Sequence, residues 1–449
     1  MLTEKSPEGN IAYMLLDLEG HIDPGVFREA LARTLARHPT MMGTLRVSFP
    51  LGRPYWKIPA DVDAEARRAA TTAHQFEDFR SVPDWQNRIA KLYPSGECFR
   101  WNHRAGPQVR FEQYALPDGR TRLFFRWPHF LMDADGAQWF LAQLGRQRPE
   151  DMALGTPGFS DLPRPVAPDE QRIDVLKGLS FFSRIRMVRR GLSAQQNHGT
   201  LRIQQLVKTP AEPYAEHRVL YRHWNSEQTR QLQELAKRTT PAGPALYARY
   251  LGSCVIRALH MIFQENGVES EAYLVTMPVR VGMSQYDAGL FERRPVPGNY
   301  LVTPVLCGRR DLVDDRRALG EDLLRQFQEY LRNKVDLTQW AMMWAASTIH
   351  AWIYRMIFKL PLDIVEFGSG FSYYGEISEP IRSLCGARVL NAWGGGPTTT
   401  PPALNPVYSK FEDRLNLSLT YDHQVISDEL AGRYLELIDQ QMFEPAESA

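Results

Sequence analysis

One pattern occurs twice in the chain, and this repeat constrains the fold more than any other feature of the sequence. Residues 123–144 are LFFRWPHFLMDADGAQWFLAQL and residues 417–438 are LSLTYDHQVISDELAGRYLELI, which aligns His129 with His423. Each copy predicts a strand, a short loop that starts at the histidine, and a helix. Two copies so far apart favour two related lobes, and a chain of 449 residues is long enough for two hydrophobic cores.

The two copies differ at the position that matters for chemistry. The first copy has Asp133 four residues after its histidine, whereas the second has Ser427 there and Asp428 one place later. A histidine that acts as a base needs groups that orient it as well as a suitable pKa. One copy therefore carries the working site, and the other is a structural remnant.

Composition excludes several classes of function. Hydrophobic residues make up 43% of the chain, charged residues 23%, and the formal net charge is +1, so no global field indicates nucleic acid or a membrane surface. The sequence has no dinucleotide or nucleotide-phosphate glycine motif and no clustered metal ligands. The four widely spaced cysteines indicate neither a disulfide framework nor zinc, and we expect them to be small buried residues: Cys98, Cys254, Cys307 and Cys385.

The periodicity of apolar residues predicts mixed helices and strands. Residues 109–115 and 121–127 predict a hairpin around the turn Pro117-Asp118-Gly119. Further strands are expected at 44–49, 217–224, 272–277, 300–306 and 414–421. Helices are expected at 25–37, 135–144, 245–264, 314–333 and 428–440.

Three other segments have a distinctive composition. Residues 149–172 are rich in Pro, Gly and Asp and predict a linker, and the Gly- and Pro-rich residues 394–406 predict a loop without regular structure. Residues 340–362 are long and apolar but contain three basic or titratable side chains, which favours a buried or amphipathic helix over a transmembrane span. The first 20 residues show no basic region followed by a long apolar run, so we expect a cytoplasmic protein.

The segment PHFLMDADG, residues 128–136, resembles a known acyltransferase motif. It is similar to the HHxxxDG motif of nonribosomal-peptide condensation domains and to the HxxxD motif of wax ester synthases, plant BAHD acyltransferases and chloramphenicol acetyltransferase. His129 and Asp133 match the pattern, Pro128 stands in place of the first histidine, and Ala134 stands where a glycine follows the aspartate. The next glycine is Gly136.

Other segments along the chain extend the resemblance to nearly its full length. Residues 30–47, ALARTLARHPTMMGTLRV, resemble the N-terminal helix and strand of condensation domains. On the same resemblance we expect six substrate-binding residues, from PHFLMDADG, PVRVG, PVPGNYLVTPVLC, FSYYGEI and NAWGGGP: Gly136, Arg280, Asn299, Ser372, Tyr374 and Trp393. The second copy, TYDHQVISD, resembles the DHRxxDG motif of dihydrolipoyl acyltransferases, which makes His423 the secondary catalytic candidate.

The resemblance implies a fold and an activity. The fold would be α+β, an α/β sandwich of two chloramphenicol acetyltransferase-like lobes in a V around a central tunnel, with an N-terminal lobe at 1–180, a linker at 181–215 and a C-terminal lobe at 216–449. The activity would be acyl transfer from a thioester to a hydroxyl or amine of a small molecule, giving an ester or amide in a secondary-metabolite or lipid pathway. His129 would be the general base. Asp133 would hold the loop, with Arg280 as its candidate partner.

The resemblance also suggests the co-substrate and the partners. We expect no permanently bound cofactor and no metal, with coenzyme A or a phosphopantetheine thioester as co-substrate. An acyl or peptidyl carrier protein is a candidate partner, and the arginines of residues 181–192 are either a solvated helix face or its docking patch. Two alternatives stay open: a free-standing enzyme that condenses carrier-bound peptides, and a non-catalytic module that recruits a carrier protein. Trp393 either lines the acceptor channel or is a packing anchor.

Overall fold

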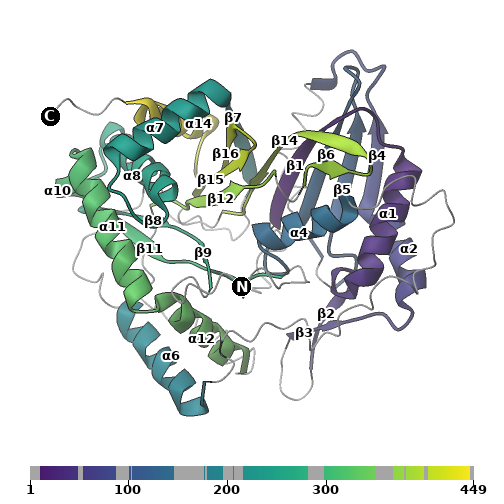
Figure 1. The fold of residues 1–449 in the computed structure, drawn as a ribbon, viewed down its shortest axis with the longest axis horizontal. Coiled ribbons are helices and arrows are strands. Elements are labelled where there is room, and N and C mark those ends of the chain that lie inside the picture. Colours follow the sequence, from purple (N-terminus) through teal and green to yellow (C-terminus); the bar gives the residue numbers. More distant parts are fainter. Residues whose placement is uncertain are drawn as a thin grey trace.

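Two sheets, each covered by helices, form the two lobes of the structure (Figure 1). The computed structural model describes residues 11–48, 54–86, 101–102, 104–145, 176, 179–195, 206, 216–281, 298–348, 368–378, 381–398 and 403–444. The linker predicted at 149–172, Cys98 and residues 349–362 lie outside these ranges. Within them, no helix is long and apolar enough to cross a membrane.

The N-terminal lobe is built on a six-stranded sheet in the order β13-β14-β1-β6-β5-β4. Its strands are β1 (Ile11–Glu19), β4 (His74–Asp78), β5 (Arg110–Ala115), β6 (Arg120–Pro128), β13 (Ser383–Leu384) and β14 (Ala387–Gly395). Helices α1 (Pro24–Arg37), α2 (Val62–Ala73) and α4 (Ala134–Gly145), the 3-10 turn η1 (Pro39–Met42) and the small hairpin of β2 (Thr44–Val47) and β3 (Pro54–Lys57) complete the lobe. The predicted β5–β6 hairpin is confirmed.

Strand β1 is central because both of its faces are buried. Met14 and Leu16 join the core beneath the helices, whereas Tyr13 and Leu15 join a second cluster on the opposite face of the sheet. That second cluster also contains Val219 from the other lobe. The two lobes are therefore in contact across this face.

The C-terminal lobe is built on a four-stranded sheet in the order β12-β15-β16-β7. The strands are β7 (His217–Trp224), β12 (Ser372–Glu376), β15 (Leu404–Phe411) and β16 (Arg414–Asp422), with shorter pairs of β8 (Ala272–Thr276) with β11 (Val305–Arg309) and β9 (Val279–Arg280) with β10 (Leu301–Val302). The helices are α6 (Phe181–Gln195), α7 (Ser226–Thr239), α8 (Leu246–Glu265), α10 (Arg310–Val313), α11 (Arg316–Arg332), α12 (Val335–Thr348) and α14 (Asp428–Phe443).

The sheet topology crosses the predicted boundary between the lobes. Residues 383–395 follow the predicted start of the C-terminal lobe at 216, yet they supply β13 and β14 to the N-terminal sheet, where β14 pairs with β1. The division into 1–180, 181–215 and 216–449 remains a prediction. The crossing strands join the two halves of the chain in one sheet.

The prediction of an irregular loop at 394–406 is wrong at both ends. β14 continues to Gly395, and β15 begins at Leu404 and includes Pro406. The glycines are needed because a Cβ at Gly395 would lie 2.1 Å from the hydroxyl oxygen of Tyr13. Pro406 is tolerated because β12 pairs with β15 only from Val407 onward, so the proline has a strand on one side alone.

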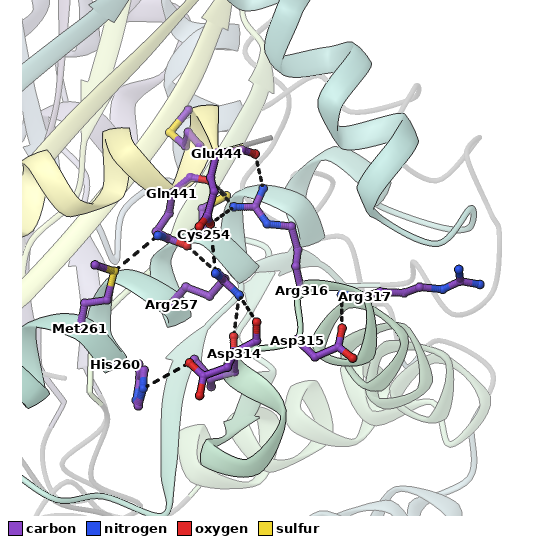
Figure 2. A network of polar contacts seen from close by, with 12 residues as sticks. Cys254, Arg257, His260, Met261, Asp314, Asp315, Arg316, Arg317, Gln441 and Glu444 are labelled. Carbon is purple, nitrogen blue, oxygen red and sulfur yellow. Dashed lines mark hydrogen bonds and ion pairs between the residues drawn. The ribbon is translucent and has the colours of Figure 1, made fainter. Parts of the chain in front are cut away.

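The end of the C-terminal helix α14 is held by two arginines (Figure 2). Arg316 donates to the main-chain oxygen of Gln441 at 2.6 Å and to the carboxylate of Glu444 at 2.9 Å, and Arg257 reaches the same carboxylate at 3.0 Å. The last carbonyls of a helix have no partner within it, and cations stabilise that end. This network fixes the repeat's second helix to α8 and α11.

Candidate active site

The loop between β6 and α4 presents His129 at the end of a buried strand. The indole N–H of Trp127 donates to the main-chain oxygen of Met132 at 2.9 Å, and the ring of Phe130 stacks on that of Trp56 with centroids 5.9 Å apart. The main-chain N–H of Leu131 donates to the oxygen of Pro128 at 2.9 Å. These contacts fix the loop, while His129 itself remains partly exposed.

Asp133 is fully buried and connects this loop with the other half of the chain. Its carboxylate accepts from the main-chain N–H of Gly136 at 2.7 Å, as the N-cap of α4, and from that of Tyr300 at 2.8 Å. Its own N–H donates to the oxygen of Gly298 at 3.1 Å. The alanine at 134 begins α4 without preventing these contacts.

Gly136 allows the two segments to lie this close. A Cβ at this position would be 2.7 Å from the main-chain oxygen of Gly298 and 2.9 Å from its nitrogen. Any larger residue would therefore separate α4 from residues 298–300. The structure gives Gly136 a steric role in assembling the site.

Asn299 is the residue that contacts the histidine from the other half of the chain. Its Nδ2 donates to the main-chain oxygen of His129 at 2.8 Å and lies 3.3 Å from Nδ1 of the ring. Its own Oδ1 accepts from the N–H of Leu301 at 3.2 Å, which fixes the amide. Asn299 and His129 were both predicted site residues, and the structure brings them together.

The His129 imidazole is neutral at neutral pH. Burial lowers the pKa of the ring to about 4, although a hydrogen bond to the residue's own main-chain carbonyl opposes the shift. Only Nδ1 can reach that carbonyl, so Nε2 is the ring nitrogen that remains for a substrate. A neutral imidazole has a lone pair that accepts a proton, which is the form a general base requires.

Arg280 forms an ion pair with Asp135, two residues beyond the aspartate suggested by the resemblance. Burial lowers the pKa of Arg280, but Asp135 and then Asp133 raise it, with a net increase. Asp135 was not among the predicted site residues. In the sequence, Asp135 is the second acid of the DADG segment and directly precedes Gly136.

The remaining predicted residues lie at different depths around this centre. The Tyr374 ring packs against β14, where a Cβ at Gly394 would lie 2.9 Å from it, and burial raises the pKa of its phenol. Ser372 begins β12 and lies opposite Val407 of β15.

Trp393 is 4% exposed and packs edge-on against the ring of His223, with centroids 4.9 Å apart. The Arg122 guanidinium lies 5.5 Å from the indole centroid, and Tyr221 also packs edge-on against it. All three neighbours belong to the region where the lobes meet. This environment favours the packing role of Trp393 over lining a channel.

His423 occupies a different environment from His129. Its Nδ1 lies 3.1 Å from the carboxylate of Asp428, which also accepts from Tyr421 at 2.6 Å and from Arg218 at 2.7 Å. Ser427, in the place of the missing aspartate, caps α14 by accepting from the N–H of Leu430 at 3.2 Å. The second copy therefore has the predicted strand, loop and helix, with its histidine in a partly exposed ion-pair cluster.

Comparisons with known proteins were informative only at the level of structure. No protein-family model matches the sequence, and no curated protein matches it. The chain is similar to the trichothecene 15-O-acetyltransferase of Fusarium sporotrichioides, with a TM-score of 0.70 at 11% identity over 98% of this chain and 92% of that one.

Two condensation domains are similar as well. The first condensation domain of the calcium-dependent antibiotic synthetase gives a TM-score of 0.69 at 16% identity over 98% of this chain and 92% of that one. The starter condensation domain of rhizomide synthetase, solved with C8-CoA, gives 0.64 at 15% identity over 100% and 92%. The predicted resemblance is thus confirmed for the fold: the chain has the mixed α/β, two-lobed architecture of condensation domains and chloramphenicol acetyltransferase-like proteins.

Proposed function

We propose that the chain is an acyltransferase that moves an acyl group from a coenzyme A or carrier-protein thioester to a hydroxyl or amine, with His129 as general base. The observation that carries the proposal is the position of His129: its imidazole is neutral, and its main-chain oxygen accepts from the amide of Asn299 in the opposite half of the chain. A fold shared with an acetyltransferase and with condensation domains supports it.

The proposed reaction needs one base and no acyl-enzyme. Nδ1 carries the ring proton beside the residue's own carbonyl, and Nε2 accepts the proton of the acceptor O–H or N–H as its heteroatom bonds to the thioester carbon. The tetrahedral intermediate then collapses, the C–S bond breaks, and the imidazolium returns its proton to the departing thiolate. The histidine ends neutral, as it began. Asp133 acts as a positioning residue because its carboxylate accepts from the main-chain N–H groups of Gly136 and Tyr300, which holds the loop against residues 298–300.

Turnover of an acyl thioester tests the assignment. Release of free thiol from short- and medium-chain acyl-CoA, with an amine or alcohol acceptor, would be measured for the wild type, His129→Ala and His423→Ala. Since a general base contributes about 10²–10⁴-fold, we expect kcat/KM to fall by that factor in His129→Ala. The matched variant His423→Ala should keep wild-type turnover. Equal activity in all three proteins would remove His129 from the mechanism.

The choice between free and carrier-bound donors is expected to depend on α6. Its four arginines have no acidic neighbour within the helix; Arg184 lies 5.3 Å from the ring centroid of Trp344 on α12, whereas Arg186 and Arg190 are exposed. We propose this exposed face as the docking patch for an acidic carrier protein or for coenzyme A phosphates. Arg186→Glu should raise KM for the charged donor at low salt, whereas an unchanged KM at every ionic strength would contradict docking at α6.

If no acyl thioester in either form is turned over by the wild type, the non-catalytic module that recruits a carrier protein becomes the better description.

A further inference from the structure

A cavity of about 250 Å³ opens on the N-terminal lobe, in a place that the proposed reaction does not use. It lies where β5 begins and β6 ends, between the end of α2, the start of β4 and residues 102–107. The polar and charged side chains among its lining residues are Thr72, Gln75, Asn102, Arg110, Glu112 and Arg126.

The carboxylate of Glu112 is already neutralised within the protein. It forms an ion pair with Arg126, and the two side chains are only 12% and 6% exposed. It also accepts from the hydroxyl of Tyr114 at 2.7 Å. The Arg126 guanidinium lies in addition 5.1 Å from the ring centroid of Phe124. Glu112 therefore neutralises the charge of Arg126, one of the two arginines that line the cavity.

A second arginine adds positive charge to the same wall. Arg110 on β5 is directly opposite Arg126 on β6, so the two side chains leave the sheet on the same face. Like charges at such opposed positions are destabilising. The Arg110 guanidinium lies 4.6 Å from the ring centroid of Trp101, and no carboxylate of the described ranges is paired with it. Neighbouring protein atoms partly desolvate the guanidinium and lower its pKa, although the residue as a whole is exposed.

The cavity therefore has two guanidinium groups, one carboxylate, and neutral hydrogen-bonding groups from Thr72, Gln75 and Asn102. The planar guanidinium matches the oxygens of carboxylate and phosphate groups. A volume of 250 Å³ holds about eight waters, so it accommodates an oxyanion with a small attached group. An anion here would neutralise the charge of Arg110, whereas Glu112 already neutralises that of Arg126.

We propose that this cavity binds the oxyanion of a small molecule, a carboxylate or a phosphate, with Arg110 as its principal contact. The inference does not rest on the activity of His129, because none of the cavity's lining residues belongs to the loop at 129–133 or to residues 298–300.

Thermal unfolding of the full chain tests the proposal. Sodium chloride would be replaced stepwise by sodium phosphate or sodium acetate at constant ionic strength, since a ligand that binds only the native state raises Tm in a saturable way. We expect a saturable rise for the wild type, and a concentration at half-effect at least about tenfold higher for Arg110→Gln, which loses a charge-assisted contact. Arg110 is exposed at the mouth of the cavity, so its replacement should leave folding intact.

Arg120→Gln is the matched control. It removes the same charge from the opposite end of β6, where Arg120 is partly exposed and paired with Asp118. The control should respond like the wild type. A rise of equal size and concentration dependence in all three proteins would show general anion stabilisation and overturn the proposal, as would the lack of a saturable rise with both anions.

The identity of the oxyanion follows from the ranking of the probes. A stronger effect of phosphate indicates a phosphorylated ligand, and a stronger effect of acetate indicates a carboxylic acid. Coenzyme A and its 3′-dephospho form provide the last comparison. If coenzyme A acts at lower concentration than inorganic phosphate and Arg110→Gln abolishes that advantage, the phosphate belongs to a thioester co-substrate; if coenzyme A has no advantage, the source is a free phosphate compound.

Discussion

Replacing Asp133 with alanine tests how the two halves of the chain are joined at the site. The carboxylate accepts one main-chain hydrogen bond from the start of α4 and one from Tyr300, and the residue has no exposed surface. In Asp133→Ala both N–H groups lose their partner in a place that water does not fill. Asn299 lies directly before Tyr300, so the contact with His129 loosens as well.

The expected loss of stability follows from these two contacts. A buried donor left unsatisfied costs about 1–3 kcal/mol, so the free energy of unfolding should fall by about 2–6 kcal/mol. Asp133→Asn retains one acceptor but turns an amide N–H₂ toward the other donor, so we expect a smaller loss, on the order of one such contact. Both variants should also lower kcat/KM, because they displace Asn299 without touching the imidazole.

Asp23→Ala supplies the control for hydrogen-bond number. Asp23 also accepts two main-chain N–H groups, those of Gly25 and Val26 at 2.8 and 2.9 Å, but as an exposed N-cap of α1. Water can replace it, so the cost should be about 0.5–2 kcal/mol. Urea unfolding, followed by far-UV circular dichroism and tryptophan fluorescence, measures all three variants. If Asp133→Ala is no more destabilising than Asp23→Ala, the argument from burial is wrong.

Three further predictions concern other parts of the chain. Gly136→Ala should lower Tm and kcat/KM through its 2.7 Å clash with Gly298, whereas Gly432→Ala in the second copy, with no atom within 4 Å of the new Cβ, should keep both or stabilise by about 0.4–1 kcal/mol. Glu112→Ala should cost about 3–5 kcal/mol in urea unfolding, because it removes the carboxylate that forms a buried ion pair with Arg126; a loss below about 1 kcal/mol, as for an exposed ion pair, would contradict this. Burial lowers the pKa of His38 and His74 to about 4, so the unfolded chain binds more protons below about pH 6.5. Stability should therefore be complete above that pH and fall by about 1.4 kcal/mol per pH unit for each histidine as the pH drops toward 4, and proton uptake on unfolding measures it.

Local patterns predicted the parts of the fold that depend on neighbouring residues. The β5–β6 hairpin and the helices at both copies of the repeat follow from alternation, turn residues and helical periodicity. The match of His129 with Asn299 came from motif resemblance, because 170 positions separate the two residues and no periodicity relates them.

Non-local pairing explains what the sequence did not reveal. Residues 383–395 join the N-terminal sheet because β14 pairs with β1. This pairing depends on the assembled sheet and not on residues that are close to 383–395 in the sequence. The alternation in β16 predicts one solvent-facing side, yet Asn416, Ser418 and Thr420 are fully buried. Asn416 pairs with Asn391 of β14 through two amide contacts of 3.2 Å, so its polar side chain faces the other lobe. A polar residue in a strand has the same pattern whether its partner is water or another sheet.

The two copies of the repeat share a local structure and differ in the groups that surround the histidine. In both, a buried strand ends at a histidine and a capped helix follows. In the first copy the capping group is a buried carboxylate that also accepts from the N–H of Tyr300, and the preceding residue, Asn299, lies beside the imidazole.

In the second copy a serine caps the helix, and the carboxylate moves one place onward to lie 3.1 Å from His423. The described neighbour of His423 is therefore a carboxylate, whereas His129 lies beside the amide of Asn299. The shift of the acid by one residue preserves the strand, loop and helix of the copy and changes the group beside its histidine. Under the proposed mechanism Ser427→Asp would keep α14 capped and leave turnover at the wild-type value, because His129 remains the base.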